Sequence, residues 1–142
     1  MNHSTILDEC RDHRSIQSKT IRKLQQLSQD YMNAATRYNH PASVHMCILF
    51  SDRAIEYLLK ALYVERNSSM APPASFSLSD VILLPVQESG LDLNMVTLIY
   101  NIHFLAGCND LSLLQQMDTL QLTNLMNCMN DIHLQLSARI AT

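Results

Sequence analysis

The side chains that could carry out chemistry are scattered along the 142 residues and form no recognised metal site. No pair of histidines has the H-x-x-x-H or H-E-x-x-H spacing that places two zinc ligands on one helix face, and histidine, cysteine and carboxylate residues form no compact cluster. We therefore predict no metal and no cofactor. The histidines are His3, His13, His40, His45, His103 and His133.

Covalent catalysis is not indicated by the sequence either. A nucleophile needs a base within hydrogen-bond reach, yet there is no G-x-S-x-G turn and no known cysteine–histidine signature. Only two glycines occur, so there is no glycine-rich loop to hold a phosphate. We assign no catalytic residue. His103 lies on an apolar helical stripe and is interpreted as a core or interface histidine, with a role as a base as the alternative.

A narrow polar ridge on the segment Pro41–Arg66 is the best candidate for a binding surface. Asp52, Glu56 and Lys60 are spaced four apart and therefore share one helix face, with Arg53 beside them. Glu56 and Lys60 form either a weak surface ion pair or part of a polar seam that borders a groove or a second subunit. We favour the seam, because the rest of this helix is apolar and needs close neighbours.

One local cluster of basic residues lies near the N-terminus. It is either a solvated helix face or a surface for an acidic partner or a phosphate backbone. The net charge of the whole chain is -3, which is not typical of a general nucleic-acid-binding protein. The members of the cluster are Arg11, Arg14, Lys19, Arg22 and Lys23.

Hydrophobic periodicity predicts the helices that must position these residues. The segment Pro41–Arg66 begins with a proline suited to a first helical position, and its apolar stripe covers about half of the helix circumference. A helix with so broad an apolar surface belongs in the middle of a bundle. The other predicted helices are Ile6–Tyr38, Leu78–Leu84, Leu93–Ala106, Leu111–Met117 and a last helix capped by Thr119 that reaches Ile140.

These segments predict an all-α fold, a single four- to five-helix up-and-down bundle with one or two short extra helices. We expect residues 1–142 to form one domain whose first part, residues 1–40, is a long helix, either continuous or broken near residues 15–20. Nothing resembles a strand, and two glycines are too few for a fold rich in tight turns.

The composition is that of a globular protein, with 47% apolar and 16% charged residues. The first fourteen residues are polar and carry both signs, unlike a signal peptide, and the longest apolar stretch is too short and too polar to span a membrane. We expect a soluble, cytoplasmic protein. In that setting the four cysteines should be reduced, with Cys47 and Cys128 buried as small hydrophobic residues.

The run SDRAIEYLLKALYVER, followed by a proline-containing loop and SFSLSDVILL, resembles HEPN domains (higher eukaryotes and prokaryotes nucleotide-binding). Those domains carry a Glu-x-x-x-Lys-Ala pattern, which is Glu56, Lys60 and Ala61 here, and a step into a short helix that often contains histidine. Here the residues from Ser75 to Leu78 take that place without a histidine. The resemblance covers about residues 43–140.

The resemblance implies a four- or five-helix bundle that is commonly dimeric. Some members are ribonucleases of toxin systems, which use an Arg-x(4–6)-His motif, whereas others lack catalysis and accompany a minimal nucleotidyltransferase or bind nucleotides. No arginine of this chain has a histidine at that spacing: Arg37 is followed by His40 too early and by His45 too late. The sequence therefore favours the non-catalytic branch.

Three functions follow as hypotheses. The first is a non-catalytic HEPN-like module, homodimeric, that binds a nucleotide, RNA or a nucleotidyltransferase partner through Arg53, Glu56, Lys60 and Tyr63. The second is a divergent ribonuclease that uses His103 or His133 together with Arg139 or Arg53. The third is a structural or regulatory protein whose long N-terminal helix holds a partner.

Overall fold

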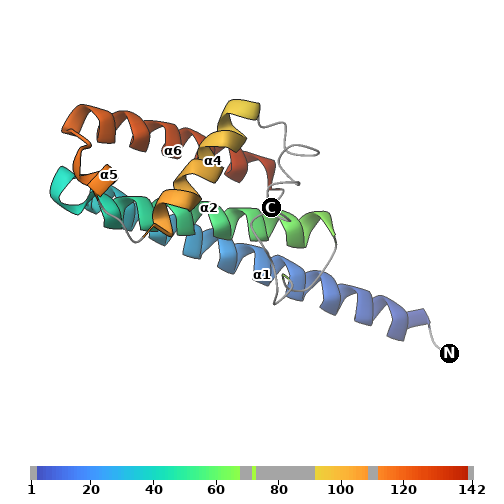
Figure 1. The fold of residues 1–142 in the computed structure, drawn as a ribbon. Coiled ribbons are helices and arrows are strands. Elements are labelled where there is room, and N and C mark those ends of the chain that lie inside the picture. The colour runs from blue at the N-terminus through green and yellow to red at the C-terminus, as the bar shows by residue number, and fades with distance from the viewer. Residues whose placement is uncertain (1–2, 68–71, 73–91, 109–111, 141–142) are drawn as a thin grey trace.

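The computed structural model describes residues 3–67, 72, 92–108 and 112–140, and within these ranges the chain is helical with no strand (Figure 1). Four helices pack as a bundle, so the predicted all-α fold is confirmed. The elements are α1 (His3–Arg37), the 3-10 turn η1 (Pro41–Ser43), α2 (Val44–Arg66), α4 (Leu93–Ala106), the single-turn α5 (Ser112–Gln115) and α6 (Thr119–Arg139).

Helix α2 is the centre of the bundle, as its broad apolar surface predicts. It packs against α1 on one side and against α4 and α6 on others, and α1 and α2 run antiparallel (Figure 1). The apolar residues that α2 contributes are almost fully enclosed, which agrees with partners on several faces. They are Val44, Cys47, Ile48, Ala54, Ile55, Leu58, Leu59, Ala61, Leu62 and Val64.

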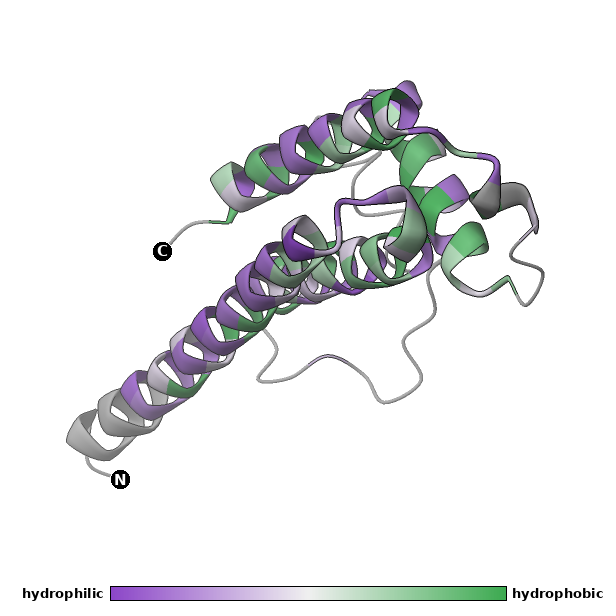
Figure 2. Cartoon of the chain, turned by 90° about the vertical axis from the view of Figure 1, so that its left-hand side faces the viewer, coloured by the Kyte–Doolittle hydropathy of each residue, from purple (hydrophilic) through white to green (hydrophobic). Residues whose placement is uncertain are grey.

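Helix α1 is continuous, which decides between the two predicted alternatives for residues 15–20. Its N-terminal part extends beyond the bundle (Figure 1), and the residues from Arg11 to Ser15 are all hydrophilic (Figure 2). The Gln17 side chain marks where packing against α2 begins, because its Nε2 donates a 2.9 Å hydrogen bond to the carbonyl of Val64 in the last turn of α2. Ile16, one residue earlier, is exposed.

The starts of α2 and α6 differ from the sequence-based prediction. Pro41 opens a 3-10 turn, and the α-helix itself begins at Val44. The last helix is capped by Asp118 instead of Thr119: the Asp118 carboxylate accepts from the backbone N–H of Gln121, and the Gln121 side chain accepts from that of Asp118. This reciprocal capping box satisfies two otherwise unpaired donors. The predicted helix Leu78–Leu84 lies outside the described residues.

Cys47, Cys108 and Cys128 are free thiols. Cys47 is buried, as predicted, and burial raises the pKa of its thiol to about 11. Its Sγ lies 3.0 Å from Sδ of Met126 on α6, inside the core. Cys128 was predicted to be buried as well, but it is exposed, because it lies on the side of α6 that faces away from the buried Met126 and Met129.

Candidate functional site

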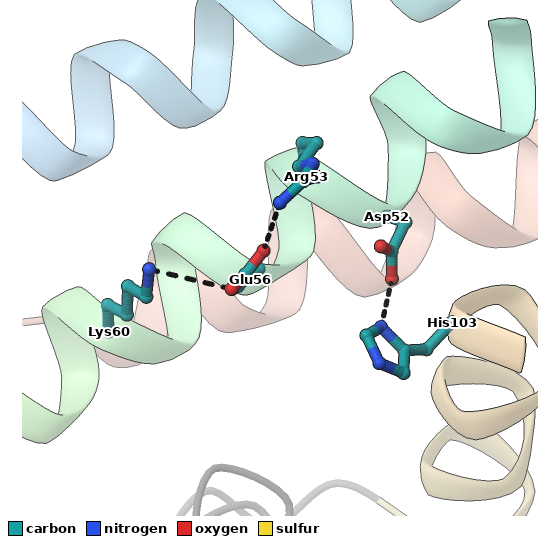
Figure 3. A network of polar contacts seen from close by, with 5 residues as sticks. All are labelled: Asp52, Arg53, Glu56, Lys60 and His103. Carbon is teal, nitrogen blue, oxygen red and sulfur yellow. Dashed lines mark hydrogen bonds and ion pairs between the residues drawn. The ribbon is translucent and has the colours of Figure 1, made fainter. Parts of the chain in front are cut away.

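Three side chains of α2 form a chain of ion pairs on the surface of the helix, and we call Arg53, Glu56 and Lys60 the polar strip (Figure 3). The Glu56 carboxylate bridges the two cations: Oε2 lies 3.4 Å from Nη1 of Arg53, and Oε1 lies 3.5 Å from Nζ of Lys60. Glu56 and Lys60 are each about three-quarters buried, whereas Arg53 is half exposed. The predicted site residues Arg53, Glu56 and Lys60 are therefore in contact.

Lys60 is held by a second contact besides Glu56. Its Nζ lies 5.3 Å from the centre of the Tyr57 ring, a distance at which an ammonium is attracted to the face of an aromatic ring. Tyr63, the fourth predicted member, is half-buried and lies one turn further along α2, where its backbone oxygen accepts from the side chain of Asn67. The strip thus occupies the middle of α2, and Tyr63 lies near its end.

Asp52 differs most from the prediction. The four-residue spacing placed it on the same polar face as Glu56 and Lys60, but its carboxylate is turned away from them and only 7% of the residue is exposed. Its Oδ1 accepts a 3.0 Å hydrogen bond from Nδ1 of His103 on α4 (Figure 3). The reason is tertiary: α4 packs over this side of α2 and covers the carboxylate.

The Asp52–His103 pair fixes the orientation of the imidazole ring. Burial raises the pKa of the Asp52 carboxyl, and the hydrogen bond and charge of His103 oppose that rise only in part. With Nδ1 used by Asp52, the ring presents Nε2 on a side chain that is 46% exposed, and Figure 3 shows this second nitrogen pointing away from the carboxylate. A histidine held in this way has one nitrogen free to exchange a proton or to bind a ligand.

A small cleft of about 130 Å³ brings His103 and Arg53 to one place. Its walls combine a carboxylate, an imidazole and a guanidinium with two small residues at the end of α4, Ala106 and Gly107. One sequence feature indicates this arrangement: a carboxylate at position 52, next to the apolar stripe of α2, needs a partner if it is buried. The lining residues are Leu49, Asp52, Arg53, His103, Ala106 and Gly107.

His133, the other histidine considered for catalysis, is a buried structural residue. Ser28 donates its hydroxyl proton to the carbonyl of Ala54 at 2.6 Å, so its Oγ accepts from Nε2 of His133 at 3.0 Å. Burial lowers the pKa of His133. Arg139 is exposed at the last position of α6. The structure thus supports Arg53 with His103 over Arg139 with His133 as a chemical pair.

The basic cluster of Arg11, Arg14, Lys19, Arg22 and Lys23 is exposed along α1, and none of these side chains makes an ion pair with another described residue. No group of three or more potential metal-ligating side chains comes together within the described ranges. No helix in the same part of the chain is both long and apolar enough to cross a membrane.

Comparisons with protein-family models, curated proteins and solved structures found no match for this chain. The resemblance to HEPN domains therefore stays a prediction that rests on residues of α2 and of the segment after it.

Proposed function

We propose that the chain is a non-catalytic, HEPN-like helical binding module of the cytoplasm, that it forms a homodimer through α4, and that it accompanies a nucleotidyltransferase or binds a nucleotide at the polar strip. The strip holds two cations against a single glutamate, so it has room for one negative group of a ligand or partner. The adjoining surface of α4 provides the apolar contact that a stable interface needs.

One observation carries this proposal. Helix α4 is apolar on its outer face as well as on the face that packs against α2. Leu93, Tyr100 and Phe104 are spaced seven and four residues apart, so they form one stripe, and Leu93 and Phe104 are about 70% exposed. An exposed stripe of large apolar residues is a feature of interaction surfaces. The stripe lies next to His103 and hence beside the cleft at Arg53.

Phe104→Asp tests the interface. Phe104 is 69% exposed, so the change removes little from the folded monomer but places a charge in the centre of the proposed contact. We expect the dimer dissociation constant to rise about 30-fold or more, as for a buried interface aromatic residue. Sedimentation velocity over a range of protein concentrations measures it.

Leu134→Asp is the matched control, because Leu134 is 66% exposed on α6 and lies outside the stripe. We expect it to leave the dimer unchanged. Lys60→Ala, which removes a cation from the neighbouring strip, should weaken dimerisation or ligand binding, whereas Lys23→Ala on α1 should not. A wild-type protein that stays monomeric at all concentrations would refute the homodimer.

The cleft supports a second candidate function, the divergent ribonuclease. Asp52 orients the ring of His103 and leaves Nε2 accessible for proton transfer, while Arg53 is placed to contact a phosphate. An imidazole that accepts the proton of the 2′-hydroxyl and a guanidinium that stabilises the phosphate charge are two groups that cleavage of an RNA backbone can use. This candidate is ranked second because Arg53 already pairs with Glu56 and the family's Arg-to-His spacing is missing.

We expect purified protein to leave a labelled single-stranded RNA intact, measured by gel electrophoresis over several hours. The His13→Ala variant serves as a control, since His13 lies on α1, away from the cleft. If wild type and His13→Ala both cut the RNA and His103→Ala does not, the second candidate replaces the first.

A further inference from the structure

A groove separates α4 from α6, both of which pack on α2. It has a volume of about 540 Å³ and continues into a smaller hollow of about 180 Å³, since Leu98 and Cys128 line both. The groove lies on a different face of α4 from the stripe of Leu93, Tyr100 and Phe104, and it shares no residue with the polar strip.

The lining of the groove is apolar at the bottom and neutral at the rim. Ile102 is buried, and Leu98, Leu105 and Leu125 are half-buried, so their exposed parts form a hydrophobic floor. The described residues that line the larger part of the groove include amide side chains but no charged side chain. These residues offer no cation to neutralise a phosphate or a carboxylate, and they suit an apolar ligand surface.

Among the described lining residues, the charged ones lie at the far end, and their charge is negative. The smaller hollow is lined by Asp92 and Asp131. Asp92 caps α4 by accepting from the backbone N–H of Met95, whereas Asp131 is exposed and forms no ion pair with any described residue. An occupant that complements the groove is therefore apolar along its length and positively charged at this end.

The groove has the dimensions of a helix. On α6 the lining residues form a row of twelve residues, or eleven rises of 1.5 Å, which is about 16 Å long. They are Gln121, Leu125, Cys128 and Ile132. On α4 the row runs the opposite way, from Leu105 beside the start of α6 toward Asp92. The slot is about three turns long along α6, and α4 crosses it obliquely (Figure 1). A slot of this length matches a third helix better than a compact small molecule.

We propose that this groove binds an amphipathic helical segment of a protein partner, with apolar residues at i, i+3, i+4 and i+7 on the floor and with a basic end beside Asp92 and Asp131. The floor provides the burial, and the two carboxylates fix the direction in which the helix lies. The basic segment of α1 from a second copy, Arg11–Lys23, fits less well, because Ile16 is its one exposed large apolar residue.

Cys128 provides the reporter for a test, because it is exposed and lines both parts of the groove. In a protein carrying Cys10→Ser and Cys108→Ser, it is the reactive thiol, since Cys47 is buried. The probe is a synthetic amphipathic peptide of about 14 leucine, alanine and glutamine residues with two lysines in one terminal turn. We expect saturating peptide to slow maleimide labelling of Cys128 by about tenfold or more.

The control peptide carries two glutamates in place of the lysines and is expected to protect Cys128 weakly. Asp131→Lys should reverse this preference, so that the glutamate peptide protects better. The proposal is overturned if neither peptide protects at about 1 mM, if both protect equally, or if Asp131→Lys changes nothing. Protection that rises with protein concentration in the absence of peptide would assign the groove to a second copy of the chain and would also overturn it.

Discussion

Acidification below pH 6.5 is expected to destabilise the fold through His133. This residue is buried, and its ring donates to the Ser28 hydroxyl in its neutral form. Burial lowers the pKa of His133 from its ordinary value of 6.5, so the unfolded chain takes up a proton at a pH where the folded chain does not. Stability from this residue is therefore complete above about pH 6.5 and is lost as the pH falls toward the folded-state pKa.

Where His133 is protonated in the unfolded state only, each unit by which the pH falls lowers the free energy of unfolding by about 1.4 kcal/mol. Asp52 has the opposite effect on stability at lower pH. Burial raises the pKa of its carboxyl above 3.8, so the folded state binds this proton at a higher pH than the unfolded state, and acidification there increases the free energy of unfolding.

Urea unfolding of wild type and His133→Gln between pH 5 and pH 7.5 isolates the contribution of the histidine. Glutamine can still donate to Ser28 but does not titrate. Equal pH slopes in the two proteins would contradict the assignment.

Leu59→Ala is expected to lower the free energy of unfolding by about 3 kcal/mol. The Leu59 side chain is fully buried on the central helix, so its removal leaves a cavity that few neighbours can fill. The loss combines the transfer of a buried aliphatic group with the cavity that remains. Thermal or urea unfolding monitored by circular dichroism measures the change.

Leu134→Ala removes the same atoms from an exposed position on α6 and is expected to cost less than about 0.5 kcal/mol. The contrast between the two leucines tests the central place of α2. If the two substitutions destabilise the protein equally, α2 is not the centre of the hydrophobic core.

The bounds of α4 were predictable from sequence because strong signals stand at both of its ends. The side chain of Asp92 caps its start, and Gly107 follows its last residue. Helix α2 was predictable within three residues, since its apolar periodicity is sustained over six turns. The cap of α6 was assigned to the wrong residue, as Asp118 and Thr119 are both good caps and local sequence does not rank them.

The candidate site was only partly predictable. Arg53, Glu56 and Lys60 meet within one helix, so their spacing was sufficient to predict the contacts. The Asp52–His103 bond joins residues that are 51 positions apart, and no local pattern specifies which side of α2 is covered by α4. The groove between α4 and α6 depends on how both helices pack against α2, and this packing cannot be predicted from local sequence.

The part of α1 that precedes Gln17 is expected to be less stable against local unfolding than the part that follows it. None of the other described helices is seen to pack on the backbone of α1 before that residue, and about fourteen residues is near the shortest length at which an isolated helix persists in water. Amide hydrogens in this part should exchange with solvent through fraying at almost no free-energy cost, whereas those near Ala35 should exchange only when the bundle opens. A partner that binds the basic residues of this segment would slow that exchange and act as the missing neighbour.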